Sequence, residues 1–215
     1  MIKNLILDHK GGYYNYKVHD IKMSLLCKNF ISLKDYLDEI FMNCPNEYFN
    51  SGPRSSGLKF KLNNLLIHQI SGHEISDLTR QALEINKERF KDNHPKVQVF
   101  LLENDDKTIA MEVPLWITPE ELKEFHSILS SKSPLTGHID VLRVENNKIW
   151  IWDYKPNAFE EKYAATQVYF YALMLSKRTN LDLENFRCGY FDHNYSYIFK
   201  PEKELINIKP LLEFL

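Results

Sequence analysis

The sequence predicts a domain of the α/β (α+β) class, in which helices flank a mixed central β-sheet. Two observations carry this prediction: helical patterns alternate with pairs of short apolar runs, and polar turns separate the two runs of each pair. The chain has 215 residues, of which 44% are apolar and 26% charged, as expected for one globular domain. We therefore expect a single domain over residues 1–215, with residues 1–70 as a less regular, partly helical N-terminal extension.

The first half of the chain predicts short elements followed by helices. Residues 1–32 contain short apolar pieces around two glycines, which suits strands or an irregular layer. Residues 32–42 carry an apolar stripe at helical spacing, and residues 50–57 have the composition of a loop. Residues 75–91 keep an approximate helical spacing of apolar positions, so we expect a second amphipathic helix there.

The second half predicts two β-hairpins with helices around them. The first hairpin joins residues 97–103 to residues 108–117, and Pro114 favours an edge strand or a bulge. The second hairpin lies between Gly137 and Lys155. The other expected elements are a helix from Thr118 to about Ser130, a helix of about twenty residues from Asn157, and strands at residues 188–191 and 195–199.

The second hairpin brings two acidic residues together. If Asn146-Asn147 forms a tight turn, the register that follows places Asp140 directly opposite Asp153. Facing carboxylates destabilise a sheet unless a positive charge neutralises them. A divalent cation suits this role, and Lys155, on the same face as Asp153, can polarise a water molecule. Lys155 could also be the counter-charge by itself.

Three segments in this part of the chain resemble the RecB-like branch of the PD-(D/E)XK nuclease superfamily, the branch that includes exonucleases of CRISPR adaptation. The segments are Gly137-His-Ile-Asp140, Asp153-Tyr-Lys155 and Gln167-Val-Tyr-Phe-Tyr171. The resemblance implies a restriction-endonuclease-like core. It also implies that Asp140 and Asp153 ligate Mg²⁺ or Mn²⁺, and that Gln167 and Tyr171 lie at the active site. Lys155 would help to orient or activate the attacking water and stabilise the charge that develops on the phosphate.

The resemblance further implies an earlier metal ligand, a histidine or glutamate near the helix that precedes the sheet. His73, which follows a glycine, is the first choice, and Glu112 lies in a strand where the family often has a glutamate. His68, Glu84 and Glu88 remain open as alternatives. The nearest approach to a basic patch consists of Arg54, Lys59 and Lys61, for which a solvated loop is the simpler explanation.

The composition of the chain limits which cofactors it can bind and in which cellular compartment we expect it. The three cysteines, Cys27, Cys44 and Cys188, cannot supply the four ligands of the iron–sulfur cluster found in several RecB-like enzymes, so we expect no cluster. The sequence shows no signal peptide and no apolar stretch of membrane-spanning length, so we expect a soluble cytoplasmic protein without membrane contact.

The predicted function is that of a metal-dependent nuclease that hydrolyses phosphodiester bonds in DNA, of the exonuclease type, acting on single strands or duplex ends. The sequence has no ATP-binding P-loop motif and therefore no helicase motor of its own. A partner, such as a helicase or another repair or recombination protein, could supply one. The alternative is a catalytically silent nuclease-like module that binds nucleic acid or a protein partner. A carboxylate-only glycosidase is disfavoured because Lys155 adjoins Asp153.

Overall fold

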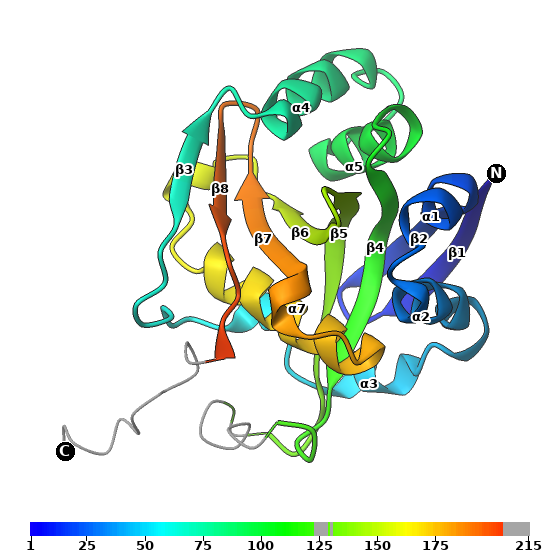
Figure 1. Ribbon diagram of the computed structural model, residues 1–215, viewed down its shortest axis with the longest axis vertical. Coiled ribbons are helices and arrows are strands. Elements are labelled where there is room, and N and C mark those ends of the chain that lie inside the picture. The colour runs from blue at the N-terminus through cyan, green and yellow to red at the C-terminus, as the bar shows by residue number, and fades with distance from the viewer. Residues whose placement is uncertain (123–128, 130, 204–215) are drawn as a thin grey trace.

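The computed structural model describes residues 1–122, residue 129 and residues 131–203. Its strands are β1 (Ile2–His9), β2 (Gly12–His19), β3 (His68–Ser71), β4 (Thr108–Ile117), β5 (Leu135–Glu145), β6 (Lys148–Tyr154), β7 (Phe186–Phe191) and β8 (Tyr195–Phe199). In the described residues they form one mixed sheet in the order β1-β2-β4-β5-β6-β7-β8-β3 (Figure 1). The N-terminal strands therefore belong to the same sheet as the hairpin of interest.

Helices pack on both faces of this sheet. They are α1 (Asp20–Leu26), α2 (Ile31–Asn43), α3 (Asn46–Ser51), α4 (Glu74–Ile85), α5 (Asn93–Asn104) and α7 (Ala164–Thr179). Alternate residues of a strand point to opposite faces. Accordingly Leu142 and Ile151 join the core around α2 and α7, whereas Val141 and Trp152 join a second core beneath α4 and α5. In the described chain, no helix is both long and apolar enough to cross a lipid bilayer.

The β5–β6 hairpin has the register that the sequence predicts. Glu145 pairs with Lys148, and the two turn residues between them, Asn146 and Asn147, have φ values of 51° and 55°. Asparagine tolerates this left-handed conformation, which a tight hairpin turn requires at both positions. The next strand pair, β6 with β7, is parallel, and α7 makes the crossover between them.

The predicted strand at residues 97–103 is wrong, because this segment is part of helix α5. Its residues from Val97 to Leu102 are all buried. Apart from Gln98 these buried residues are apolar, and a short apolar run looks the same in a buried helix as in a buried strand, so periodicity alone could not separate them. The edge position suggested by Pro114 is also wrong, since β4 lies inside the sheet. Its missing N–H is tolerated because β2 pairs with β4 only at Ala110 and Met111.

The other predicted elements are shifted rather than absent. The helix expected from Asn157 begins only at Ala164, after a 3₁₀ turn at Ala158–Glu160. The expected loop at residues 50–57 contains the end of α3 and a 3₁₀ turn at Ser55–Gly57. The helix expected from Thr118 falls largely outside the described residues. The late strands are confirmed as β7 and β8.

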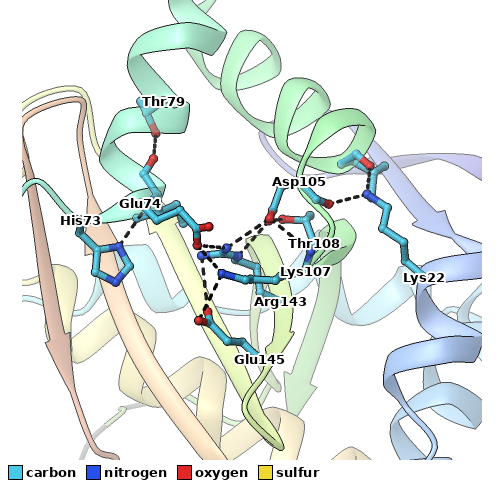
Figure 2. A network of polar contacts seen from close by, with 11 residues as sticks. Lys22, His73, Glu74, Thr79, Asp105, Lys107, Thr108, Arg143 and Glu145 are labelled. Atoms are coloured by element: carbon cyan, nitrogen blue, oxygen red, sulfur yellow. Dashed lines mark hydrogen bonds and ion pairs between the residues drawn. The ribbon is translucent and has the colours of Figure 1, made fainter.

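An ionic network with a buried centre, formed by Arg143 and Asp105, joins α4, α5, β4 and β5 (Figure 2). Arg143 of β5 is fully buried, and its guanidinium lies 2.9 Å from Asp105 Oδ2 and 2.8 Å from Glu74 Oε2. Lys107 Nζ lies 2.6 Å from the same Glu74 oxygen. The network fixes β5 against α5, the helix that reaches over the carboxylates described below.

Replacing Arg143 by methionine should lower the free energy of unfolding by about 3–5 kcal/mol, because Asp105 would remain buried without its partner. The matched control is Arg80→Met. Arg80 pairs with Asp77 at an exposed site, and such pairs contribute about 0–1 kcal/mol. Urea unfolding of the two variants measures both free energies. Equal losses of unfolding free energy would show that the Arg143 network stabilises the fold no more than an exposed ion pair does.

Candidate active site

Five residues predicted from the sequence line one pocket at the end of the β5–β6 ladder. They are Asp140 of β5, Asp153 at the end of β6, Lys155 directly after it, and Gln167 and Tyr171 of α7. The parallel βαβ crossover explains the meeting, because it returns α7 across the face of the sheet that carries Asp153. The pocket therefore combines two acidic groups, one amine and one amide–phenol pair.

The two aspartates lie where the strands stop pairing. Val141–Trp152 is the last paired position of β5 and β6, and beyond it Asp140 Oδ2 accepts a hydrogen bond of 2.8 Å from the backbone N–H of Tyr154. Asp153 is almost completely buried and lies 2.7 Å from Lys155 Nζ through its Oδ2 atom. The carboxylate of Asp140 thus satisfies a backbone donor that the ladder leaves without a strand partner.

Gln167 connects α7 to the acidic pair. Its Nε2 atom donates to Asp153 Oδ1 over 3.1 Å and to Tyr171 Oη over 2.7 Å. Residues four apart lie on the same face of a helix, which is why one amide reaches both groups. The approach of Tyr171 depends on Gly137, since a Cβ atom there would stand 2.3 Å from the Tyr171 ring. The glycine of the Gly-x-x-Asp segment therefore has a packing role.

Glu112 of β4 is a third acidic group in the same pocket, as the sequence suggested. It stands between the pairs Met111–Val141 and Val113–Ile139, so it lies opposite Asp140. Its φ of 52° is strained for a residue with a side chain. Its Oε1 atom accepts a hydrogen bond of 2.6 Å from Gln98 Nε2.

Helix α5 contributes two pocket-side residues that the sequence analysis missed, His94 and Gln98. His94 Nε2 lies 3.8 Å from Asp140 Oδ2, and its ring packs edge-on against Tyr154. Partial desolvation holds the pKa of His94 below its ordinary value, so the ring is neutral at neutral pH and able to act as a ligand. The four-residue spacing of His94 and Gln98 would have revealed a shared helix face, had this segment been identified as a helix.

The proposed ligand His73 is not brought to the carboxylates. It is the N-cap of α4, where its Nδ1 atom accepts a hydrogen bond of 3.2 Å from Ile75 N, and its ring contacts Trp152 on the other face of the sheet. The alternatives also lie outside the pocket: His68 is on the edge strand β3, and Glu84 and Glu88 are exposed. Of the proposed earlier ligands, only Glu112 meets the aspartates.

Burial raises the pKa of all three carboxyl groups. The pKa of Asp140 is raised to about 6 and that of Asp153 to about 7, in both cases against the opposing charge of Lys155. Burial and the charge of Asp140 raise the pKa of Glu112 to about 8. Burial acts to lower the pKa of Lys155, but the charges of Asp153 and Asp140 outweigh it and raise the value. Lys155 and the guanidinium of Arg54, which acts to lower the pKa of Glu112, therefore supply too little positive charge for three ionised carboxylates.

The chemistry of these donors fits a divalent cation. Carboxylate oxygens are the ligands that Mg²⁺ and Mn²⁺ prefer, and an added double charge would allow all three groups to ionise. Among the described residues, no three histidine, cysteine, aspartate or glutamate side chains lie in an arrangement that could hold a metal ion, because protein donors occupy the acidic oxygens. Binding a cation would exchange some of these hydrogen bonds for coordination.

Comparison with protein-family models identifies the class of this protein. The model of the PD-(D/E)XK nuclease superfamily matches residues 63–205, well over half of the chain. The chain therefore belongs to the PD-(D/E)XK nuclease superfamily, and the predicted restriction-endonuclease-like fold is confirmed. Its members typically use divalent metals such as Mg²⁺, and membership implies a nucleic-acid substrate. A search of curated proteins finds no match.

Gly137→Ala should lower the free energy of unfolding by about 1–3 kcal/mol, because the added methyl group overlaps the Tyr171 ring. Gly57→Ala is the matched control, since a Cβ atom at Gly57 meets nothing within 4 Å. Thermal and urea unfolding of both variants test this; two similar stabilities would mean that α7 does not need the glycine.

Asp153→Asn should change how stability depends on pH in metal-free solution. The pKa of Asp153 is raised from 3.8 to about 7, so the folded protein holds a proton that the unfolded chain releases. Stability from this group is therefore lost as the pH rises from about 4 to about 7. Asparagine does not titrate, so the variant should gain stability relative to wild type across that window.

Urea unfolding in EDTA at a series of pH values measures this difference, with the exposed Asp182→Asn as the control. Added Mg²⁺ should stabilise wild type more at pH 8 than at pH 5.5, because metal binding displaces protons. A constant difference between Asp153→Asn and wild type at all pH values would show that Asp153 is ionised without a cation.

Proposed function

We propose that this protein is a metal-dependent nuclease that hydrolyses phosphodiester bonds in DNA, an exonuclease of the RecB-like type. One observation supports it above the others: three buried carboxyl groups share a pocket with Lys155 and Arg54, and their pKa values stay raised despite these two positive charges. The carboxyl groups and Lys155 occur on consecutive elements in the order expected for the family, and the Gln167–Tyr171 pair of the RecB-like pattern contacts Asp153 directly.

Asp140 and Asp153 are the proposed ligands of Mg²⁺ or Mn²⁺, with Glu112 or His94 completing the protein's share of the coordination. When bound, such a cation supplies a Lewis acid for a phosphate oxygen and lowers the pKa of water. The protein groups around it have supporting tasks. Gln98 orients Glu112, and Tyr154 N–H orients Asp140, so that both acids keep one oxygen directed by the protein.

Lys155 is the proposed electrostatic partner of the reaction. Its raised pKa keeps the ammonium charged at any physiological pH, so it cannot act as a base there. A charged amine held 2.7 Å from Asp153 can instead donate hydrogen bonds to the attacking water or to the phosphate as negative charge builds on it. Gln167 and Tyr171 hold Asp153 for this purpose.

The substrate and partners follow from the family resemblance. The RecB-like pattern favours DNA with a free end, as a single strand or a duplex terminus. A helicase or another repair or recombination protein is the proposed partner that would open duplex DNA. The alternative, a catalytically silent module that binds nucleic acid, is distinguished from the nuclease by the experiment below.

Cleavage of end-labelled single- and double-stranded DNA should require Mg²⁺ or Mn²⁺ and stop in EDTA. Asp153→Asn and Lys155→Met should each lower the rate by about 100-fold or more, because one removes a ligand and the other a charge from the transition state. Asp182→Asn and Lys162→Met, both at exposed sites, are the matched controls and should cut like wild type.

Release of single nucleotides from one end would establish the exonuclease, and internal fragments would make the enzyme an endonuclease. Metal-dependent binding of DNA without any cutting would favour the silent module. Equal activity of Asp153→Asn and wild type would contradict the assigned site.

A further inference from the structure

A second group of polar residues borders the carboxylate pocket and has no role in the chemistry described above. Its centre is Arg54, which lines the pocket together with Tyr14, Ser56 and His138. Arg54 comes from the loop after α3, Tyr14 from β2, and His138 from β5, two residues before Asp140. From the sequence, a solvated loop is the simpler explanation for Arg54, but its side chain lines the pocket.

The backbone of Arg54 is fixed against the start of β5. Arg54 forms an isolated β-bridge with Thr136, and Thr136 N donates a hydrogen bond of 3.0 Å to Pro53 O. Gly52 makes this docking possible, because a Cβ atom there would stand 2.0 Å from Pro134 O. The loop is thus attached to the strand that carries Asp140.

The Arg54 side chain is held by neutral acceptors. Its Nη1 atom donates to Lys10 O over 2.6 Å and to the Tyr14 hydroxyl over 2.5 Å, and its Nη2 atom lies 3.0 Å from His138 Nδ1. The guanidinium carbon also lies 4.9 Å from the centre of the Tyr14 ring. None of these partners carries a negative charge, so the positive charge of Arg54 is preserved.

The hydrogen bond from Arg54 determines the tautomers of two buried histidines. Arginine only donates, so His138 Nδ1 must accept, and the proton of this ring is on Nε2. His138 Nε2 lies 2.9 Å from His9 Nδ1, which must then accept in turn. His9 Nε2 is left as a donor, and it lies 2.8 Å from the side-chain oxygen Oδ1 of Asn46. The chain Arg54–His138–His9–Asn46 is consistent only with neutral imidazoles.

Arg54 therefore differs from Arg143, the buried arginine of β5. Arg143 is fully enclosed and contacts the carboxylates of Asp105 and Glu74. Arg54 is only half-buried, and within the described residues it has no carboxylate at ion-pair distance. Its three hydrogen bonds use three of five N–H groups. A rigidly held guanidinium with donors to spare is suited to bind an anion of forked geometry.

We propose that Arg54 binds a phosphate group of the nucleic acid beside the carboxylate pocket, and that His138 and His9 are positioning residues that hold the guanidinium for this contact. The inference rests on the proposed function for the identity of the ligand. Phosphate is the anion that such a substrate presents in every nucleotide, and a bidentate arginine contact would set the distance of the strand from Asp140. The phosphate belongs either to the backbone or to a strand end.

The test measures binding without cutting. In an Asp153→Asn background, fluorescence anisotropy of a short 3′-labelled single-stranded DNA gives the dissociation constant over a range of salt concentrations. Arg54→Met should weaken binding about tenfold or more and reduce the slope of log K against log salt by about 0.7, the loss of one phosphate contact on a single strand. A purely structural role would leave that slope unchanged.

Three further variants separate charge from position. Arg187→Met is the matched control, because Arg187 also donates to backbone carbonyls but lines a different depression, beside Trp150, and its slope should equal that of the background protein. Arg54→Lys keeps the charge and should keep the slope. His138→Phe removes the Nδ1 acceptor that holds Arg54, but it leaves an aromatic ring to stack on Tyr14, whose ring centre in wild type lies 3.7 Å from that of His138. This variant should therefore weaken DNA binding while the slope stays the same.

Comparing strands with a 5′-phosphate and a 5′-hydroxyl also shows whether Arg54 binds a terminal or an internal phosphate. If the effect of Arg54→Met disappears on a strand with a 5′-hydroxyl, the phosphate is terminal; if it persists, the phosphate is internal. An unchanged slope in Arg54→Met, or an equal loss in Arg187→Met, would overturn the inference while cleavage by wild type keeps the nuclease proposal. Absence of both binding and cleavage in wild type would overturn both.

Discussion

The burial of three carboxyl groups beside one ammonium group is the constraint on which the site depends. Asp140, Asp153 and Glu112 come from three adjacent strands, and their pKa values are all raised. Such a cluster is unfavourable for folding when ionised, since each charge loses its hydration. The surrounding structure compensates with directed donors: Gln98, Gln167 and the Tyr154 N–H each bind one of these acids. A divalent cation would complete the compensation.

The fold could be predicted from the sequence wherever local chemistry determines the structure. Two asparagines fix a turn with left-handed φ values, and the turn fixes the register that brings Asp140 to the end of β6. The sequence failed where burial hides periodicity. Residues 97–102 are enclosed between α4 and the sheet, so every position is apolar or buried and the helical repeat is invisible.

That failure also explains most of what was missed in the site. His94 and Gln98 reach the acids only because α5 is a helix, and a strand at the same place would have directed them to other surroundings. His73 was chosen from its position after a glycine, yet its ring nitrogen serves the α4 N-terminus. Arg54 could not be found by spacing at all. Its loop reaches the pocket through a bridge to Thr136, more than eighty residues away in the sequence.

Strand β5 supplies residues to both parts of the pocket. His138 and Asp140 lie on the same face of this strand, and His138 contacts a cationic group while Asp140 is itself an anionic group. His138 accepts a hydrogen bond from Arg54, which has no acidic hydrogen-bond partner among the described residues, while Asp140 accepts a hydrogen bond from the backbone N–H of Tyr154 and faces the positive charge of Lys155. Both hydrogen bonds use a neutral partner, so neither hydrogen bond cancels a charge. The same strand is fixed from behind by Arg143, whose charge is fully paired. Paired ions thus stabilise β5, and charges held by neutral partners face the pocket, where a cation and a phosphate together would satisfy them.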